Sequence, residues 1–230
     1  MPFKIARFCI AALLALSVLT LGTDAARCEG RLNSSFPFEE VCYEVVFNGT
    51  GGFSLRSYAG ANAAAALATS NASSSITTYQ EALELTTFLV IEYFVGSGNA
   101  KNVSLLDART VPLVLRPPTP SHNFWASHMA VAPSRFPSVA KAPRAAGSDL
   151  SLLPMGDVTL AVLHDTLTSS PQPADFAALC KRLEVAVKAQ SPGWSVDASS
   201  PYSPSHARFD SFEFYEGPFD IECWLGVQKA

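Results

Sequence analysis

The stretch Gly52-Phe53-Ser54-Leu55-Arg56-Ser57-Tyr58 decides the start of the fold. Its apolar and polar residues alternate directly after a glycine turn, and this period of two is typical of a β-strand with one buried face. The segment Cys42-Tyr43-Glu44-Val45-Val46 has the same character, and the turn Gly49-Thr50-Gly51-Gly52 joins the two. We therefore predict a pair of strands, with Phe53 and Leu55 in the core.

The same alternation returns near the C-terminus, in Ala207-Arg208-Phe209-Asp210-Ser211 and in Ile221-Glu222-Cys223-Trp224-Leu225. Both segments are predicted to be strands, with Leu225 buried. Further strands are predicted over 124–131 and 157–164. Residues 133–143 are predicted to form an exposed loop, because prolines interrupt them.

Two amphipathic helices are expected, one in each half of the chain. The first begins with Thr78 as its cap and Glu81 three residues later, and it ends at Gly96 and Gly98. The second carries one apolar stripe and stops at Ser191-Pro192-Gly193. The buried faces of the two helices are expected to include Leu83, Leu179, Cys180 and Leu183.

A strand followed by a helix occurs in both halves, so the chain has two halves with one plan. Strands outnumber helices, which favours the α+β class: two helices on a curved antiparallel sheet or open barrel. The chain is long enough for one core, and no linker divides it.

Residues 1–26 have the pattern of a cleaved secretory signal. Lys4 and Arg7 precede an apolar run, and Ala25-Ala26 offers a small-residue cleavage site. The run is shorter than the ~18 residues expected of a membrane span. We therefore expect a secreted protein, or one in the lumen of the secretory pathway. Residues 27–40 would form an N-terminal extension.

Four N-x-[ST] sequons agree with secretion, and they predict glycosylation on exposed loops at Asn33, Asn48, Asn71 and Asn102.

Four cysteines remain after removal of the signal, and an oxidising compartment would pair them in one of three ways. No C-x-x-C motif or nearby histidine points to a metal site. Proximity in sequence favours Cys28–Cys42, which leaves Cys180–Cys223 as the second bridge.

The formal net charge of −4 and the absence of a basic stripe argue against nucleic acid as a partner. No second apolar run is long enough to cross a bilayer, so the mature chain is expected to have no membrane span. A monomer is expected.

The two ends of the chain together resemble the SOUL haem-binding family. Tyr43-Glu44-Val45 with Phe53…Tyr58 is similar to the opening of that family, and Ala207…Ser211 with Glu222…Leu225 is similar to its close. The likeness covers about 41–228, and cysteines ahead of the first strand suit a secreted, plant-type member. The resemblance implies a distorted β-barrel flanked by two helices, built from two pseudo-symmetric halves.

The resemblance also implies non-catalytic binding of haem or a related tetrapyrrole in a shallow apolar groove beside the first helix. The wall of that groove would carry Glu84, Thr87, Phe88 and Ile91, which lie at i, i+3, i+4 and i+7. Ser57 stands where some members have a histidine proposed as an iron ligand. Glu84 would repel haem propionates. Because Ser57 replaces that histidine, iron coordination is expected to be weak, and metal-free porphyrin is expected to bind about as well as haemin.

No catalytic motif is apparent in the sequence. The four histidines are scattered, and although His164 lies beside Asp165, adjacent strand residues point to opposite faces. We therefore expect no enzyme activity. The alternatives are a secreted binding module for another apolar ligand and, less favoured, an enzyme acting on a small apolar substrate.

Overall fold

The computed structural model describes residues 28–29, 39–71, 76, 78–108, 110, 112–119, 124–209 and 218–230. The proposed signal peptide and Asn33 lie outside these residues, and the side chains of Cys28, Glu29 and Asn71 are not described either.

Both predicted helices and all six predicted strands overlap an element of the structure, and six further strands were not predicted. The described residues form twelve strands, two long helices and one short helix. They are β1 (Cys28–Glu29), β2 (Glu39–Glu40), β3 (Glu44–Asn48), β4 (Phe53–Tyr58), β5 (Ala66–Asn71), α2 (Tyr79–Val95), a short 3-10 helix η1 (Leu106–Ala108), β6 (Leu113–Arg116), β7 (Ala126–Ala130), β8 (Leu150–Pro154), β9 (Val158–Leu167), α3 (Pro173–Gln190), β10 (Trp194–Val196), β11 (Ser205–Arg208) and β12 (Phe219–Lys229).

Ten strands form one antiparallel sheet in the order β3-β4-β9-β12-β11-β6-β7-β5-β8, and β10 pairs with the end of β12. Strands β1 and β2 form a separate pair. The fold is thus α+β, as predicted. The expected closure into a barrel is not observed among the described strands, because β3 and β8 stand at the two ends of the pairing order and do not pair with each other.

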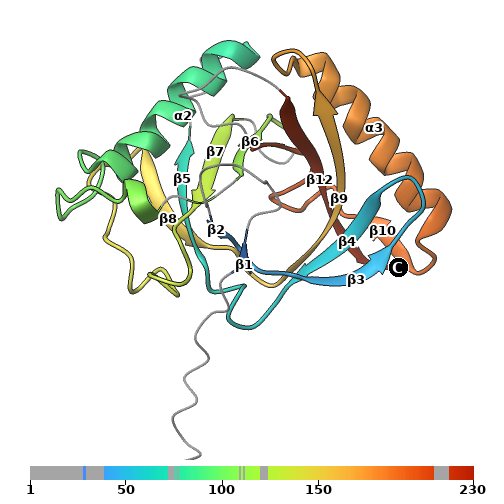
Figure 1. The fold of residues 1–230 in the computed structure, drawn as a ribbon, viewed down its shortest axis with the longest axis horizontal. Helices are drawn as coiled ribbons and strands as arrows, with labels where there is room; N and C mark the ends of the chain where they lie inside the picture. Colours follow the sequence, from blue (N-terminus) through green and yellow to red (C-terminus); the bar gives the residue numbers. More distant parts are fainter. Residues whose placement is uncertain are drawn as a thin grey trace, which may run out of the picture.

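Both helices pack against the same face of the sheet, one on each half (Figure 1). Helix α2 covers β5, β6 and β7, and α3 covers β4, β9 and β12. The opposite face, which we call the inner face, has its own apolar cluster around Tyr58, Val114 and Trp224. All six residues predicted for the core are buried: Phe53, Leu55, Leu83, Leu179, Leu183 and Leu225.

Local signals placed the helices correctly. Thr78 is the N-cap of α2, and its hydroxyl accepts a hydrogen bond from the backbone N–H of Glu81 at 3.3 Å. Gly96 closes the helix with a φ of 120°, a conformation that favours glycine. Helix α3 begins after Gln172 and ends before Ser191, next to the predicted stop.

Several predicted strand bounds are wrong by a few residues. Strand β9 runs beyond the predicted end at 164, because β12 continues to pair with it as far as Leu167. Strand β11 begins at Ser205 and stops before Phe209. The predicted loop over 133–143 is present, but it is not wholly exposed, because Pro133, Ala142 and Pro143 are buried.

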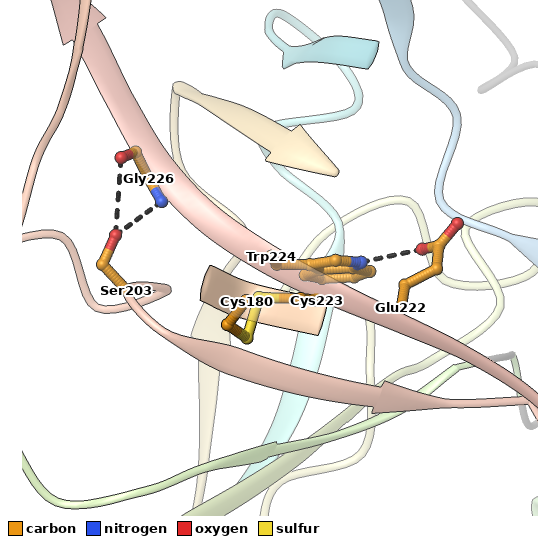
Figure 2. The surroundings of a disulfide bond; sticks show 6 residues. All are labelled: Cys180, Ser203, Glu222, Cys223, Trp224 and Gly226. Atoms are coloured by element: carbon orange, nitrogen blue, oxygen red, sulfur yellow. Dashed lines mark hydrogen bonds between the residues drawn. A yellow bond between two sulfur atoms is a disulfide. The ribbon is translucent and has the colours of Figure 1, made fainter. Parts of the chain in front are cut away.

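The predicted bridge between Cys180 and Cys223 is confirmed, with the two Cα atoms 5.2 Å apart (Figure 2). It ties α3 to β12. Cys42 is disulfide-bonded as well. Its pairing with Cys28 stays a prediction, although β1 and β2 bring the backbone of Cys28 opposite Glu40.

No helix among the described residues is long and apolar enough to cross a membrane.

Candidate functional site

Two hollows of very different size bear on function. The first is a small cavity on the inner face, between the two halves of the sheet. It leaves about 20 Å³ accessible to the centre of a water molecule. A single water needs ~10–15 Å³ on that measure, so the cavity has room for one water, or two at most. Its lining includes Glu40, Val41, Arg56, Tyr58, His128, Met155, Phe209, Glu222 and Trp224.

A buried ion pair forms one wall of this inner cavity. Arg56 Nη2 donates to Glu222 Oε1 at 2.6 Å, and Nη1 donates to Oε2 at 3.0 Å. Trp224 Nε1 donates to the same carboxylate at 2.8 Å (Figure 2). Burial acts to lower the pKa of Arg56, but the Glu222 charge and its hydrogen bonds outweigh burial and raise it. The guanidinium therefore stays charged, and its hydrogen bonds to Glu222 occupy this wall of the cavity.

Two buried nitrogens beside this cavity have no hydrogen-bond partner among the described residues: Arg56 Nε and His128 Nε2. Burial, together with the nearby positive charge of Arg116, lowers the pKa of His128 to about 3. His128 is therefore neutral at physiological pH. The size and polarity of the cavity suit a bridging water better than an organic ligand.

The second hollow is an open cleft of about 830 Å³ at the C-terminal end of α2, which we call the basic cleft. Its lining comes from the turn after the helix, with Ala100 and Lys101, from the loop over 139–145, and from Leu152 of β8. The side chains between the charged residues are apolar: Val139, Ala140, Ala142, Pro143, Ala145 and Leu152.

Hydrogen bonds fix the turn after α2. The side chain of Asn99 is buried; its Nδ2 donates to the carbonyls of Tyr93 and Val103, and its Oδ1 accepts from the backbone N–H of Lys101. Gly98 is needed at this point, since a Cβ there would lie 2.7 Å from the backbone nitrogen of Tyr93.

The turn after α2 and the loop over 139–145 are also joined to each other by hydrogen bonds. The N–H of Ala100 donates to the carbonyl of Arg144 at 2.8 Å, and the N–H of Ala146 donates to the carbonyl of Gly98 at 2.9 Å. The Tyr93 hydroxyl donates to the carbonyl of Pro143 at 2.8 Å. The cleft is therefore preformed in its backbone.

The basic cleft gathers three positively charged side chains. Lys101, Lys141 and Arg144 are exposed, and none has an ion-pair partner among the described residues. Three other exposed cations have ion-pair partners: Arg135 with Asp107, Arg182 with Asp165, and Lys188 with Glu184. Lys181 on α3 has no ion-pair partner among the described residues, but it does not line the cleft. No acidic residue lines the cleft. An anion with an apolar body matches this surface.

The four residues predicted to form a groove beside the first helix lie on α2, and none of them lines the basic cleft. Glu84 and Phe88 are exposed, Phe88 to 58%, and Ile91 is half-buried. Thr87 is only 4% exposed, so it packs beneath the helix and cannot contact a ligand on the outer side. Three of the four residues thus share an exposed face.

His164 forms a surface pair with Asp220. Its Nε2 lies 2.9 Å from Asp220 Oδ1, while Asp165 bonds Arg182. Adjacent residues of β9 therefore point apart, as predicted. Among the described residues, no cluster of histidine, cysteine and acidic side chains could hold a metal ion.

Two of the sequons with described side chains, Asn48 and Asn102, are at exposed positions. Asn102 directly follows Lys101 of the basic cleft, with a φ of 49°. Whether either carries a glycan stays a prediction.

Neither the family models nor the curated proteins include a match to this chain. Solved structures with some similarity include a hydrolase from Listeria innocua (10% identity, TM-score 0.41, 71% of this chain and 87% of that one) and an uncharacterised conserved protein from the same organism (8%, 0.43, 71% and 88%). Another is SAV2435 bound to tetraphenylphosphonium (10%, 0.37, 76% and 93%). Similarities this low assign no function to the chain.

Proposed function

We propose that the protein is a non-catalytic carrier or scavenger of haem or a related tetrapyrrole, and that the ligand lies in the basic cleft. The observation that carries the proposal is the set of three unpaired cations, Lys101, Lys141 and Arg144, around an apolar surface. A porphyrin has a flat apolar ring with carboxylates at its edge, so its two parts match the two parts of the cleft. The family resemblance of the sequence supports the same ligand class.

Size favours the basic cleft over the inner cavity as the ligand site. Sites for ligands of this size usually measure ~300–1,000 Å³, and the basic cleft, at about 830 Å³, falls in that range. The inner cavity, at about 20 Å³, does not. A porphyrin on the inner face would have to displace Val41, which is packed there, as well as the buried Glu40.

Charge favours the basic cleft over the groove beside Glu84. Carboxylates of the ligand would be attracted to Lys141 and Arg144 and repelled by Glu84. The metal is expected to matter little, because no histidine, cysteine or methionine lines the cleft. Iron-free protoporphyrin should therefore bind about as tightly as haemin.

The test is an absorbance titration with protoporphyrin and with haemin, using the wild type, Lys141→Glu and Arg144→Glu. Reversing one exposed charge removes an attraction and adds a repulsion, so affinity should fall roughly two- to thirtyfold. Lys181→Glu is the matched control, because Lys181 is an exposed cation on α3 with no ion-pair partner among the described residues. Equal losses in all three variants would mean that only net charge matters.

Two further variants test the position beside α2. If the ligand lay there, Ile91→Asp should abolish binding and Glu84→Lys should strengthen it, while the cleft variants would change little. If no porphyrin binds to any form, the result favours the second candidate function, a binding module for another apolar ligand. The observation that favours this candidate is the exposed apolar set on α2, Leu85 at 44%, Phe88 at 58% and Val95 at 51%.

A further inference from the structure

We propose that the inner face is a second binding site, which a releasable strap closes in this structure. The strap is the segment over 39–43, which includes β2. The site beneath it suits a planar aromatic ligand that carries a hydrogen-bond acceptor. This proposal does not depend on the tetrapyrrole function, because the inner cavity and the basic cleft share no lining residue.

The strap lies on the inner face without joining the ten-stranded sheet. Strand β2 pairs with β1 in a separate two-stranded sheet, and both lie between the two halves of the large sheet (Figure 1). A single isolated bridge connects Glu39 to Thr110. Because no ladder joins the strap to the described strands of the large sheet, the strap can leave while that sheet stays paired.

The strap is anchored at both ends. At one end, the backbone N–H of Ser134 donates to Glu39 Oε1 at 2.9 Å, and the Ser134 hydroxyl donates to Oε2 at 2.6 Å. At the other end, Cys42 is buried and disulfide-bonded. Between the anchors, Glu40 and Val41 line the inner cavity. Loss of the anchors is therefore expected to uncover this cavity.

The contacts of Tyr43 indicate the class of ligand that the uncovered site would bind. Its ring lies over the guanidinium of Arg56, with the ring centroid 4.6 Å from Cζ. The centroid of the Tyr58 ring is 5.7 Å away. The Tyr43 side chain is only half-buried. A planar ring of a ligand would make the same two contacts once the strap has left.

The strap fills this site incompletely. Arg56 Nε and His128 Nε2 are buried on residues that line the inner cavity, and neither has a hydrogen-bond partner among the described residues. The Nε of a guanidinium can only donate. An acceptor oxygen on the ligand would occupy the space that the cavity leaves for a water, and it would form the hydrogen bond to Arg56 that the strap does not supply.

The experiment is a fluorescence titration of the intact protein with Nile red, a planar neutral dye with a carbonyl oxygen. The dye has no charge for the cations of the basic cleft to attract. Apparent affinity scales with the fraction of molecules whose site is open, so Glu39→Gln combined with Cys42→Ser should bind the dye roughly tenfold or more tightly than the wild type. Glu44→Gln, which changes an exposed carboxylate just outside the strap, is the matched control and should bind as the wild type does.

A competing peptide locates the bound dye. A synthetic peptide with the sequence of residues 38–44, carrying Cys42→Ser, should displace the dye from the double variant, and a scrambled peptide should not. If the double variant does not unfold cooperatively in urea, Glu39→Gln alone repeats the test with a smaller expected gain. An unchanged affinity after loss of the anchors would overturn the proposal. An equal gain in Glu44→Gln, or equal displacement by both peptides, would overturn it as well.

Discussion

The guanidinium of Arg56 on β4 reaches past β9 to the carboxylate of Glu222 on β12, with Nη2 and Oε1 2.6 Å apart. The two strands are not neighbours, so this contact joins three strands on the inner face. The ring of Tyr43 covers the guanidinium, with its centroid 4.6 Å from Cζ. The pair has side-chain exposures of 3% and 1%.

Removal of one partner from this pair should destabilise the protein strongly. Arg56→Met leaves the Glu222 carboxylate buried without its cation, and the expected loss is ~3–5 kcal/mol in the free energy of unfolding. Replacement of both, as Arg56→Met with Glu222→Leu, should recover most of that loss. Urea unfolding of the single and double variants measures both values. If the free energy of unfolding of Arg56→Met lay within ~1 kcal/mol of the wild-type value, the Glu222 carboxylate would have to be hydrated in solution, which would contradict this prediction.

Acid should destabilise the protein through its buried histidines. Burial lowers the pKa of His206 to about 4, while an unfolded chain has a histidine pKa of ~6.5. Between these values the unfolded state binds the proton and the folded state does not. The contribution of His206 to the free energy of unfolding is therefore fully present above pH 6.5 and is lost as the pH falls toward 4. The slope is ~1.4 kcal/mol per pH unit for each such group. His128 adds to it down to a pKa of about 3.

The matched variant is His206→Phe. The imidazole stacks on Phe176 with 4.7 Å between ring centroids, and a phenyl ring keeps that contact without a proton to gain. The acid slope of the variant, measured by thermal unfolding between pH 4 and 6.5, should be smaller than that of the wild type. An unchanged slope would contradict the assignment of acid sensitivity to His206.

Leu183 should be a large contributor to the core beneath α3. The side chain is fully buried, so Leu183→Ala loses transfer free energy and leaves a cavity, and unfolding should become easier by roughly 2–5 kcal/mol. The exposed Val185 on the same helix, 61% accessible, is the control, and Val185→Ala should change stability by no more than ~0.5 kcal/mol. Chemical denaturation distinguishes the two.

Secretion should place N-glycans on Asn48 and Asn102, since both side chains are exposed. Intact mass before and after enzymatic deglycosylation gives the number of glycans, and Thr50→Ala and Ser104→Ala remove one sequon each without altering the asparagine. Loss of one glycan mass in each variant is the expected result. A mass that matches the bare chain in the secreted protein would refute this prediction.

Local patterns were sufficient to predict the parts of this fold that depend on neighbouring residues. The alternation over 53–58 gave β4 with its correct bounds, and Thr78 with Gly96 gave both ends of α2. The Cys180–Cys223 bridge followed from elimination among four cysteines.

The basic cleft could not be predicted, because its cations come from two loops that are far apart in the chain. Hydrogen bonds between these loops, such as the one from Ala100 to Arg144, bring them together, and no periodicity marks such bonds. A search for cations near glycine and proline turns, such as Gly98 and Pro143, would have been the available signal. The prediction for Thr87 was wrong for a related reason. Spacing along a helix defines a face, but only the packing of α2 against β5 and β7 shows which side is buried, and Thr87 lies on that buried side.

The open sheet has one more consequence, which concerns how this protein would behave at high concentration. Strand β3 pairs only with β4 among the strands that the structure describes, so its other edge offers backbone donors and acceptors, and its residues Val45 and Val46 are 42% and 44% exposed. Such an edge can add a strand from another molecule. The register shift between Val45 and Phe47 interrupts the row, and a glycan on Asn48 would stand directly at its end. Chains made without sugars should therefore self-associate through this edge more readily than secreted ones.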